Sequence, residues 1–309
     1  MFIEKKKQGK SIKYYLANSY REKGVPRKIR KYLGTNLTQE EIKRKKILAE
    51  REIKNLIEEL NTEVFNFSLR KSQINTLNNL NNNFKIFRLS KKDFERFTKD
   101  FVYNTNAIEG SNLLEGEVEE ILEEKNKTKD PEKIEAIGVA NAIDYIKSKK
   151  EELSLELIKK LHLLCFDESK SYAGKFRNVE VVIKNSSGEI VHQGVLAKHL
   201  ELALKDFIAW YNKNKTKFKP IVLAAIIHNQ FEYIHPFQDG NGRVGRLLLN
   251  FILLKDKYPP INIYLEDRQE YYQCLQEYQT YQNLKPTVKF LIKQYKKTLR
   301  KATTNKKKR

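Results

Sequence analysis

The sequence predicts a mainly α-helical protein with short β-hairpins, and three observations lead to this prediction. Glycine and proline are scarce, with 12 and 7 residues among 309, which argues against a turn-rich all-β fold. Apolar residues recur at helical spacing over most of the chain after residue 38. Alternating β-branched and aromatic residues are confined to residues 12–33 and 179–191. Hydrophobic residues make up 40% of the chain, which is enough for a core and excludes a collagen-like or disordered protein.

The N-terminal segment, residues 1–34, is predicted to form a small basic β-hairpin. Residues 12–20 and 27–33 are rich in aromatic and β-branched residues, and a turn composition separates them. Thr38 then begins a capping box, which predicts a long helix that runs to about Leu60. Residues 61–90 are rich in asparagine and poorly patterned, and within them we expect residues 78–83 to form a linker or a loop. The helix and this linker together form a connecting segment, residues 35–94.

From Ser90 onward the pattern is helical, and we place the main domain at residues 95–295. Ser90 and Asp130 are expected helix starts, and the stretch from Leu153 to Phe166 is amphipathic. Valine and isoleucine residues on both sides of an Asn-Ser-Ser-Gly turn predict a second hairpin over residues 179–191. Helices are expected to resume near Leu196 and to continue to a basic tail, residues 296–309.

The formal net charge of +21 is concentrated at the two ends of the chain. Residues 1–34 carry a net charge of +9, residues 293–309 carry another +9, and the 258 residues between them carry +3. Two interpretations stay open: basic ends can serve solubility, or they can bind nucleic acid or another polyanion.

The cysteine content and the N-terminus indicate a cytoplasmic protein. Two cysteines, Cys165 and Cys274, cannot build a disulfide framework or a cysteine zinc site, so we expect a reducing compartment. Lysines occupy the N-terminus where a signal peptide would need an apolar run. The longest apolar runs, such as residues 221–227, are too short to span a bilayer, so no membrane interaction is expected.

Residues 221–254 contain the strongest functional signal. An apolar helix is expected to end at Ile234 or His235 because Pro236 disfavours its continuation, and a second apolar helix begins at Arg243. In the loop between the helices, two glycines beside Asn241 let backbone N–H groups converge on one point. The dipole of the second helix reinforces this anion-binding nest.

Side chains suited to phosphate chemistry surround the nest. Arg243 and Arg246 lie three residues apart on one helix face and can clamp more than one phosphate. His235 is a natural proton acceptor at neutral pH, and Asp239 offers a hard oxygen ligand for magnesium. A base, a metal ligand, an anion nest and an arginine clamp within twelve residues indicate a site for attack on a polyphosphate.

Residues 235–246, His-Pro-Phe-Gln-Asp-Gly-Asn-Gly-Arg-Val-Gly-Arg, resemble the signature of the Fic (filamentation induced by cAMP) family at all nine specified positions. The resemblance implies a Fic-type helical bundle with a β-hairpin flap. It also implies protein adenylylation, in which AMP moves from ATP to a Ser, Thr or Tyr hydroxyl of a target protein or of the chain itself. His235 would then take the hydroxyl proton and Asp239 would hold Mg²⁺. The phosphates would be bound by Gly240, Asn241, Gly242, Arg243 and Arg246. The related phosphorylating Doc branch has lysine where this chain has Gly242, which favours nucleotidyl transfer.

Two less specific stretches extend the resemblance. The segment from Ala173 to Arg177 and the hairpin after it look like the family's flap, which aligns the target by strand addition. This implies a role for Val181, Val182, Ile183 and Lys184. Residues 268–272 resemble the family's segment behind the adenine, which implies nucleotide contacts for Tyr271 and Tyr272, with ordinary aromatic core as the alternative.

Residues Thr105–Gly110 fit the family's inhibitory motif, Ser/Thr-x-x-x-Glu-Gly/Asn, and lie upstream of the signature, as in the class with an N-terminal inhibitory helix. The resemblance implies that Glu109 pairs with Arg246 and inhibits the enzyme. Two other functions stay open: the same site could remove AMP from a modified protein, or the chain could be a nucleic-acid-binding regulator with a Fic core. The target protein, the nucleotide preference and a homodimer are also left open.

Overall fold

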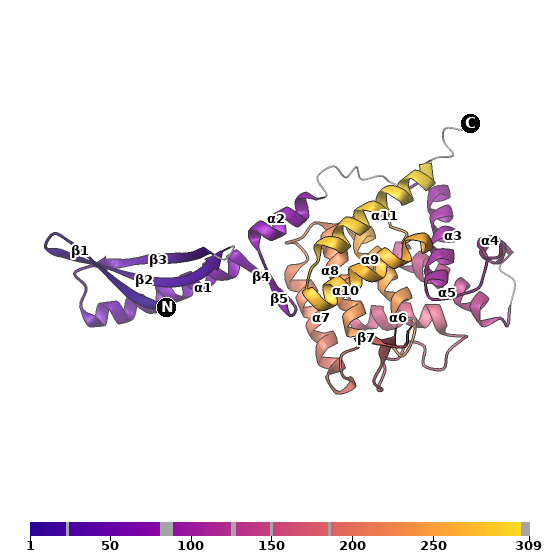
Figure 1. The fold of residues 1–309 in the computed structure, drawn as a ribbon, viewed down its shortest axis with the longest axis horizontal. Coiled ribbons are helices and arrows are strands. Elements are labelled where there is room, and N and C mark those ends of the chain that lie inside the picture. Colours follow the sequence, from indigo (N-terminus) through magenta and orange to yellow (C-terminus); the bar gives the residue numbers. More distant parts are fainter. Residues whose placement is uncertain (23–24, 81–88, 125–127, 149–150, 185–186, 304–309) are drawn as a thin grey trace. The chain divides into compact units, whose positions relative to one another are not determined.

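The computed structural model describes residues 1–22, 25–80, 89–124, 128–148, 151–184 and 187–303 (Figure 1). The chain divides into two compact units. The first unit comprises Met1–Glu63 and Ser68–Gln73, and the second comprises Val64–Phe67 and Ile74–Arg309.

The first unit is a three-stranded antiparallel sheet with one helix packed against it. The strands are β1 (Phe2–Gln8), β2 (Ser11–Glu22) and β3 (Val25–Thr35), in the order β1-β2-β3. The helix α1 (Gln39–Leu60) follows a capping box in which Thr38 and Glu41 exchange hydrogen bonds. The sheet and the helix enclose a small core of Tyr14, Leu16, Leu33, Ile42, Ala49 and Ile53.

The predicted N-terminal hairpin is present as β2 and β3, and β1 adds a third strand that the sequence analysis did not include. Residues 5–7 of β1 are three consecutive lysines, so the strand lacks the alternation of apolar and polar residues by which a strand is recognised in a sequence. A tight turn at Gly9, where φ is +59°, brings β1 back against β2.

Residues 61–79 form regular structure, although their sequence is poorly patterned and predicted no element before the linker expected at residues 78–83. This stretch forms a two-stranded sheet of β4 (Asn61–Val64) and β5 (Phe67–Arg70), followed by the helix α2 (Lys71–Asn79). Its buried apolar residues are few and lie among polar ones, so they give no clear period; they are Val64, Leu69, Ile74 and Leu77. Residues 81–83 of the expected linker lie outside the described residues.

The second unit is a bundle of helices, as the sequence predicts (Figure 1). Its helices before the hairpin are α3 (Lys91–Ile108), α4 (Glu115–Glu124), α5 (Pro131–Ser148) and α6 (Leu155–Phe166). Its helices after the hairpin are α7 (Leu200–Asn214), α8 (Pro220–Ile234), α9 (Asn241–Lys255), α10 (Arg268–Tyr281) and α11 (Lys285–Thr303). Short 3₁₀ turns at Ala197–His199 and Leu265–Asp267 lead into α7 and α10. The expected start at Ser90 is confirmed, because Ser90 and Asp93 form a capping box.

Helices α8 and α9 lie side by side at the centre of this bundle (Figure 1). Both are buried along almost their whole length, which explains why the first half of α8, residues 221–227, is apolar on all of its faces. Helix α8 ends at Ile234, as predicted, because His235 adopts the left-handed conformation with φ of +53° and Pro236 follows it. The corner between the two helices therefore sits at a fixed place in a rigid core.

The predicted second hairpin is confirmed as β6 (Val182–Lys184) paired antiparallel with β7 (Ile190–Gln193). Arg177 fixes its base to the α8–α9 corner. The guanidinium of Arg177 donates from Nε to the carbonyl of His235 at 2.7 Å and from Nη1 to the carbonyl of Val179 at 2.7 Å. Among the described residues, none of the helices has the length and hydropathy that crossing a bilayer requires.

Candidate active site

The loop between α8 and α9 is held in shape by its own residues. The side-chain amide of Asn241 accepts from the Phe237 N–H at 2.8 Å and donates to the Phe237 carbonyl at 2.9 Å. Gly240 has φ of +80°, and a Cβ there would lie 2.3 Å from the ring of Phe166. Only glycine fits this position. The first N–H groups of α9 lack intrahelical acceptors by the geometry of any α-helix, so the corner offers them to an anion.

His235 lies at the end of α8, beside this cradle. Its backbone N–H donates to the Phe231 carbonyl at 2.9 Å, which fixes the residue as the cap of α8. Burial, and then the neighbouring His192, lower the pKa of His235 to about 4. The imidazole is therefore neutral at physiological pH. Its Nδ1 is buried and has no hydrogen-bond partner among the described residues. A neutral ring beside an anion cradle can accept a proton.

Arg246 is the most completely enclosed cation of the site, with 2% of the residue exposed. Its Nε donates to the Thr105 hydroxyl at 2.6 Å, and its Nη2 donates to the Thr105 carbonyl at 2.9 Å. The same Nη2 donates to Oε1 of Glu109 at 2.7 Å. Burial alone would lower the pKa of Arg246, but the Glu109 carboxylate raises it well above the ordinary value. The guanidinium is thus fixed between the C-terminal end of α3 and the first turns of α9.

Glu109 stands at the mouth of the α9 cradle. A Cβ at position 242 would lie 2.1 Å from Oε1 of Glu109, so the carboxylate rests directly on Gly242. Glu109 is the C-cap residue of α3, and its side chain is 32% exposed. A carboxylate therefore occupies the space next to the helix N-terminus where a phosphate group would be most favourably placed.

Arg243 and Asp239 are linked by two side chains that the sequence analysis did not single out. Glu135 of α5 makes an ion pair with Arg243, and Lys170 makes ion pairs with Glu135 at 3.1 Å and with Asp239 at 2.8 Å. Burial would raise the pKa of Asp239, but Lys170, Arg243 and the Gly240 N–H together lower it. Asp239 is therefore ionised, and 46% of its side chain is exposed beside the cradle.

Two buried histidines, which give no ligand spacing in the sequence, support the site from behind. His162 accepts from the Gly174 N–H through Nδ1 at 2.9 Å and so donates through Nε2 to the Asp239 carbonyl at 3.0 Å. Nε2 of His228 lies 2.9 Å from the hydroxyl oxygen of Tyr271, at hydrogen-bond distance. Burial lowers the pKa of His162 to about 4 and that of His228 to about 3, so both act as neutral hydrogen-bonding groups.

The two tyrosines of α10 lie in different surroundings. Tyr271 is 2% exposed, and its hydroxyl lies 3.5 Å from Nη1 of Arg246. Tyr272 is 45% exposed, and its hydroxyl donates to the Ile108 carbonyl at 3.1 Å. Tyr271 thus supports Arg246 from the core, and Tyr272 is the tyrosine with a surface that a nucleotide can reach.

The flap strand β6 leaves one edge unpaired in the hairpin. Gly194 N–H donates to the Val181 carbonyl at 3.2 Å, and Val182 lies opposite Gln193. By antiparallel alternation, the N–H and carbonyl of Val182 then point away from β7. A Cβ at Gly194 would lie 3.2 Å from Cβ of His235, so the hairpin passes directly by the histidine. The predicted flap residues and His235 are therefore neighbours; the side chain of Lys184 is outside the described residues.

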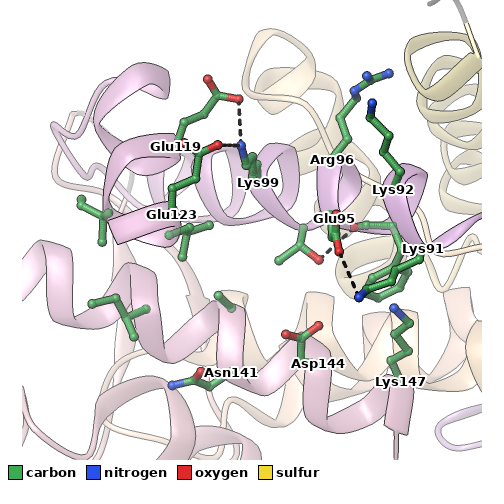
Figure 2. A pocket seen from close by; sticks show the side chains of 16 residues that line it. Lys91, Lys92, Glu95, Arg96, Lys99, Glu119, Glu123, Asn141, Asp144 and Lys147 are labelled. Carbon is green, nitrogen blue, oxygen red and sulfur yellow. Dashed lines mark hydrogen bonds and ion pairs between the residues drawn. The ribbon is translucent and has the colours of Figure 1, made fainter. Parts of the chain in front are cut away.

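A separate cavity of about 890 Å³ lies between α3, α4 and α5 (Figure 2). Charged side chains dominate its lining, and Lys99 pairs there with Glu119 at 3.6 Å and Glu123 at 2.5 Å. None of the predicted site residues lines it. The signature residues therefore lie at the α8–α9 corner and not at this cavity.

Comparison with known proteins agrees with this geometry. Residues 152–253 match the Fic/DOC family. The chain is 30% identical over 207 residues to "Protein adenylyltransferase Fic" of Nematostella vectensis, which covers 64% of this chain and 47% of that protein. It is 32% identical over 203 residues to "Protein adenylyltransferase fic-1" of Caenorhabditis elegans, and this alignment covers 62% of this chain and 39% of that protein. The chain thus spans less than half the length of these curated relatives.

Solved structures show the same fold. A Fic domain containing signaling protein from Bacteroides thetaiotaomicron has a TM-score of 0.63 at 23% identity, over 75% of this chain and 94% of that chain. Fic-1 (aa134–508) from C. elegans has a TM-score of 0.61 at 24% identity, over 88% of this chain and 79% of that chain. The family match over residues 152–253 contains both the signature at the α8–α9 corner and the flap beside it, so this part of the chain is a Fic/DOC domain.

Proposed function

We propose that this chain is a protein adenylyltransferase that moves AMP from ATP to a hydroxyl of a target protein or of itself. The observation that carries the proposal is the neutral imidazole of His235 beside the backbone N–H cradle at the start of α9. The names of the curated relatives, protein adenylyltransferases at 30–32% identity, support it.

In the proposed reaction the hydroxyl oxygen of the target attacks the α-phosphorus of ATP. A new P–O bond forms, the bond from the α-phosphorus to the bridging oxygen breaks, and pyrophosphate leaves. The hydroxyl proton passes to the unprotonated nitrogen of His235. The cradle N–H groups and the arginines position the phosphates and neutralise their charge, which is the main protein contribution to this chemistry.

We propose that Asp239 is the protein ligand of Mg²⁺, which when bound neutralises charge on the phosphates. The described residues contain no group of three His, Cys, Asp or Glu side chains that could hold a metal alone. An exposed, ionised carboxylate beside a phosphate cradle fits a magnesium ion that shares its remaining ligands with ATP and water. Lys170, which pairs with both Asp239 and Glu135, would keep Glu135 as a partner if Asp239 held the ion.

Glu109 is proposed to inhibit the transfer by competition for Arg246. The guanidinium donates to Glu109 from Nη2 and to Thr105 from Nε and Nη2, so no second anion can take the Glu109 position while the carboxylate is there. The γ-phosphate of ATP then lacks its cation, and a triphosphate bound in another pose misaligns the α-phosphorus. Displacement of a reacting atom by about 1 Å can cost on the order of a hundredfold in rate.

The outer edge of β6 is proposed to bind extended target backbone. The N–H and carbonyl of Val182 point away from β7, and strand addition needs only such main-chain groups. Because the hairpin passes by His235, a target segment on this edge would bring its hydroxyl toward the imidazole.

The test is incubation of the purified chain and candidate acceptor proteins with α-labelled or γ-labelled ATP. Label on protein from the α position alone is the expected result, and label from the γ position would identify a kinase. Loss of label from a previously adenylylated protein, abolished by Glu109→Gly, would instead assign removal of AMP with Glu109 orienting water.

A further inference from the structure

The sheet of the first unit has one face that α1 covers and one face that α1 leaves open (Figure 1). Strand alternation and the pairing register assign residues to these faces. Leu16 points toward α1, so its neighbours in the strand, Tyr15 and Ala17, point to the open face. Tyr15 lies opposite Glu4 on one side and Tyr32 on the other, and Ala17 lies opposite Phe2 and Arg30. Among the described side chains, the open face therefore carries Phe2, Glu4, Lys6, Lys13, Tyr15, Ala17, Ser19, Lys28, Arg30 and Tyr32, with Gln8, Ser11 and Thr35 at the ends of the strands.

The open face is strongly cationic. Among its described side chains, four are basic, Lys6, Lys13, Lys28 and Arg30, against one acid, Glu4. Glu4 is shared between Lys28 and Arg30, with its Oε2 2.7 Å from Nε of Arg30, so one carboxylate must balance two of the cations. The remaining positive charge is presented to solvent from a rigid sheet.

Aromatic rings form a platform under these cations. Tyr15 and Tyr32 lie with their ring centroids 5.4 Å apart. Nζ of Lys6 is 5.9 Å from the centroid of Tyr15, and Nζ of Lys28 is 5.2 Å from that of Phe2. Lysines thus stand over rings that could otherwise stack on bases, which favours contacts to backbone phosphates over the base stacking that single strands require.

We propose that this open face of the β1-β2-β3 sheet binds duplex DNA. A sheet of three strands measures about 10 Å between its outer strands. The major groove of B-form DNA is about 12 Å wide and admits elements of about this width, such as an α-helix or a two-stranded β-ribbon, whereas side chains cannot read the deep and narrow major groove of an RNA duplex. Four cations on a flat face match the rows of phosphates that border the groove. The chemistry is independent of the adenylyltransferase site, and it adds a binding function to the first unit.

The test measures binding of the full chain to a fluorescein-labelled DNA duplex of mixed sequence, by anisotropy, at several salt concentrations between 50 and 200 mM. The double variant Lys6→Gln with Arg30→Gln removes two exposed cations from the open face. The matched control, Lys43→Gln with Lys45→Gln, removes two exposed lysines from α1 of the same unit. Circular dichroism melting of both variants shows whether they remain folded.

The open-face variant should bind at least tenfold more weakly at 100 mM salt. Its slope of log K against log salt should be shallower by about 2, since each phosphate contact contributes about 0.9. The α1 control should change affinity less than twofold. The proposal is overturned if the wild type does not bind the duplex, if both variants lose affinity equally, or if single-stranded DNA or duplex RNA binds more tightly through the same residues.

Discussion

Replacement of Glu109 by glycine should raise the proposed adenylyl transfer and lower the stability of the protein at the same time. The substitution removes the charge-assisted hydrogen bond from Arg246 Nη2, which spans 2.7 Å. Such bonds contribute about 1.5–3 kcal/mol net, and because each 1.36 kcal/mol is a factor of ten, release of this competitor should raise α-label transfer about 10- to 150-fold. Glu109 is the C-cap of α3 and not an interior helical residue, so glycine there carries little penalty in helix propensity.

The same substitution leaves the buried charge of Arg246 with Thr105 as its remaining strong acceptor. Loss of the Glu109 carboxylate should lower the free energy of unfolding by about 1–3 kcal/mol. This is less than the loss of about 3–5 kcal/mol that is typical when a fully buried ion pair is broken, because the side chain of Glu109 is 32% exposed. The melting temperature should then fall by about 2–12 °C, since about 1 kcal/mol shifts a domain of this size by about 2–4 °C. ATP should restore it more strongly than in the wild type, since the γ-phosphate replaces the carboxylate.

The assay compares wild type, Glu109→Gly and Glu109→Gln in parallel, with initial rates of α-label transfer and melting curves with and without ATP. Glutamine keeps an oxygen acceptor for Arg246 without the charge and should give an intermediate rate. Transfer by Glu109→Gly within twofold of wild type, with an acceptor present, would refute the competition between Glu109 and ATP for Arg246.

Three further substitutions test other parts of the account. Val182→Pro removes an N–H from the outer edge of β6, so target modification should fall far more than ATP affinity; equal losses in the two assays would make the hairpin merely structural. Burial raises the pKa of the Glu232 carboxyl from 4.5 to about 8. Between these two pH values the folded protein keeps a proton that the unfolded chain releases. The free energy of unfolding should therefore fall as the pH rises from about 4.5 to about 8, by at most about 1.4 kcal/mol per pH unit. Glu232→Gln should flatten that fall in urea titrations from pH 5 to 8, and an unchanged slope would show that Glu232 is ionised in the folded state. Gly240→Ala places a Cβ against Phe166 at a left-handed φ, so the melting temperature should drop by several degrees, and a wild-type melting curve would contradict the packing of the corner.

The parts of the site that the sequence predicted are those fixed by local chain geometry. Pro236 and the glycines around Asn241 dictate the end of α8 and the start of α9, so the corner and its cradle follow from adjacent residues. The pairing of Glu109 with Arg246 came from a motif and not from spacing, because 137 residues separate the two. The role of Glu109 in inhibition stays a prediction.

The parts that sequence reasoning missed depend on contacts between distant elements. Glu135 and Lys170 look like ordinary charged residues of helix and loop, and only the packing of α5 and α6 against α9 brings them to Arg243 and Asp239. His162 has no ligand spacing because it serves the backbone of two loops. The strand β1 was missed for a different reason, since its three consecutive lysines mask the alternation that pairing with β2 reveals.

The most direct test of the central claim, that His235 is the base at the α9 cradle, is mass spectrometry of the double variant His235→Ala with Glu109→Gly after incubation with Mg²⁺, ATP and an acceptor. The imidazole acts on the attacking hydroxyl and does not contribute to nucleotide affinity. The affinity of the double variant for ATP should therefore lie within about threefold of that of Glu109→Gly, because the groups that bind ATP are the same in both proteins. The adduct of one adenylyl group, present with Glu109→Gly alone, should be absent. An adenylyl adduct that accumulates in the double variant as fast as in Glu109→Gly would contradict the assignment of His235 and, with it, the mechanism.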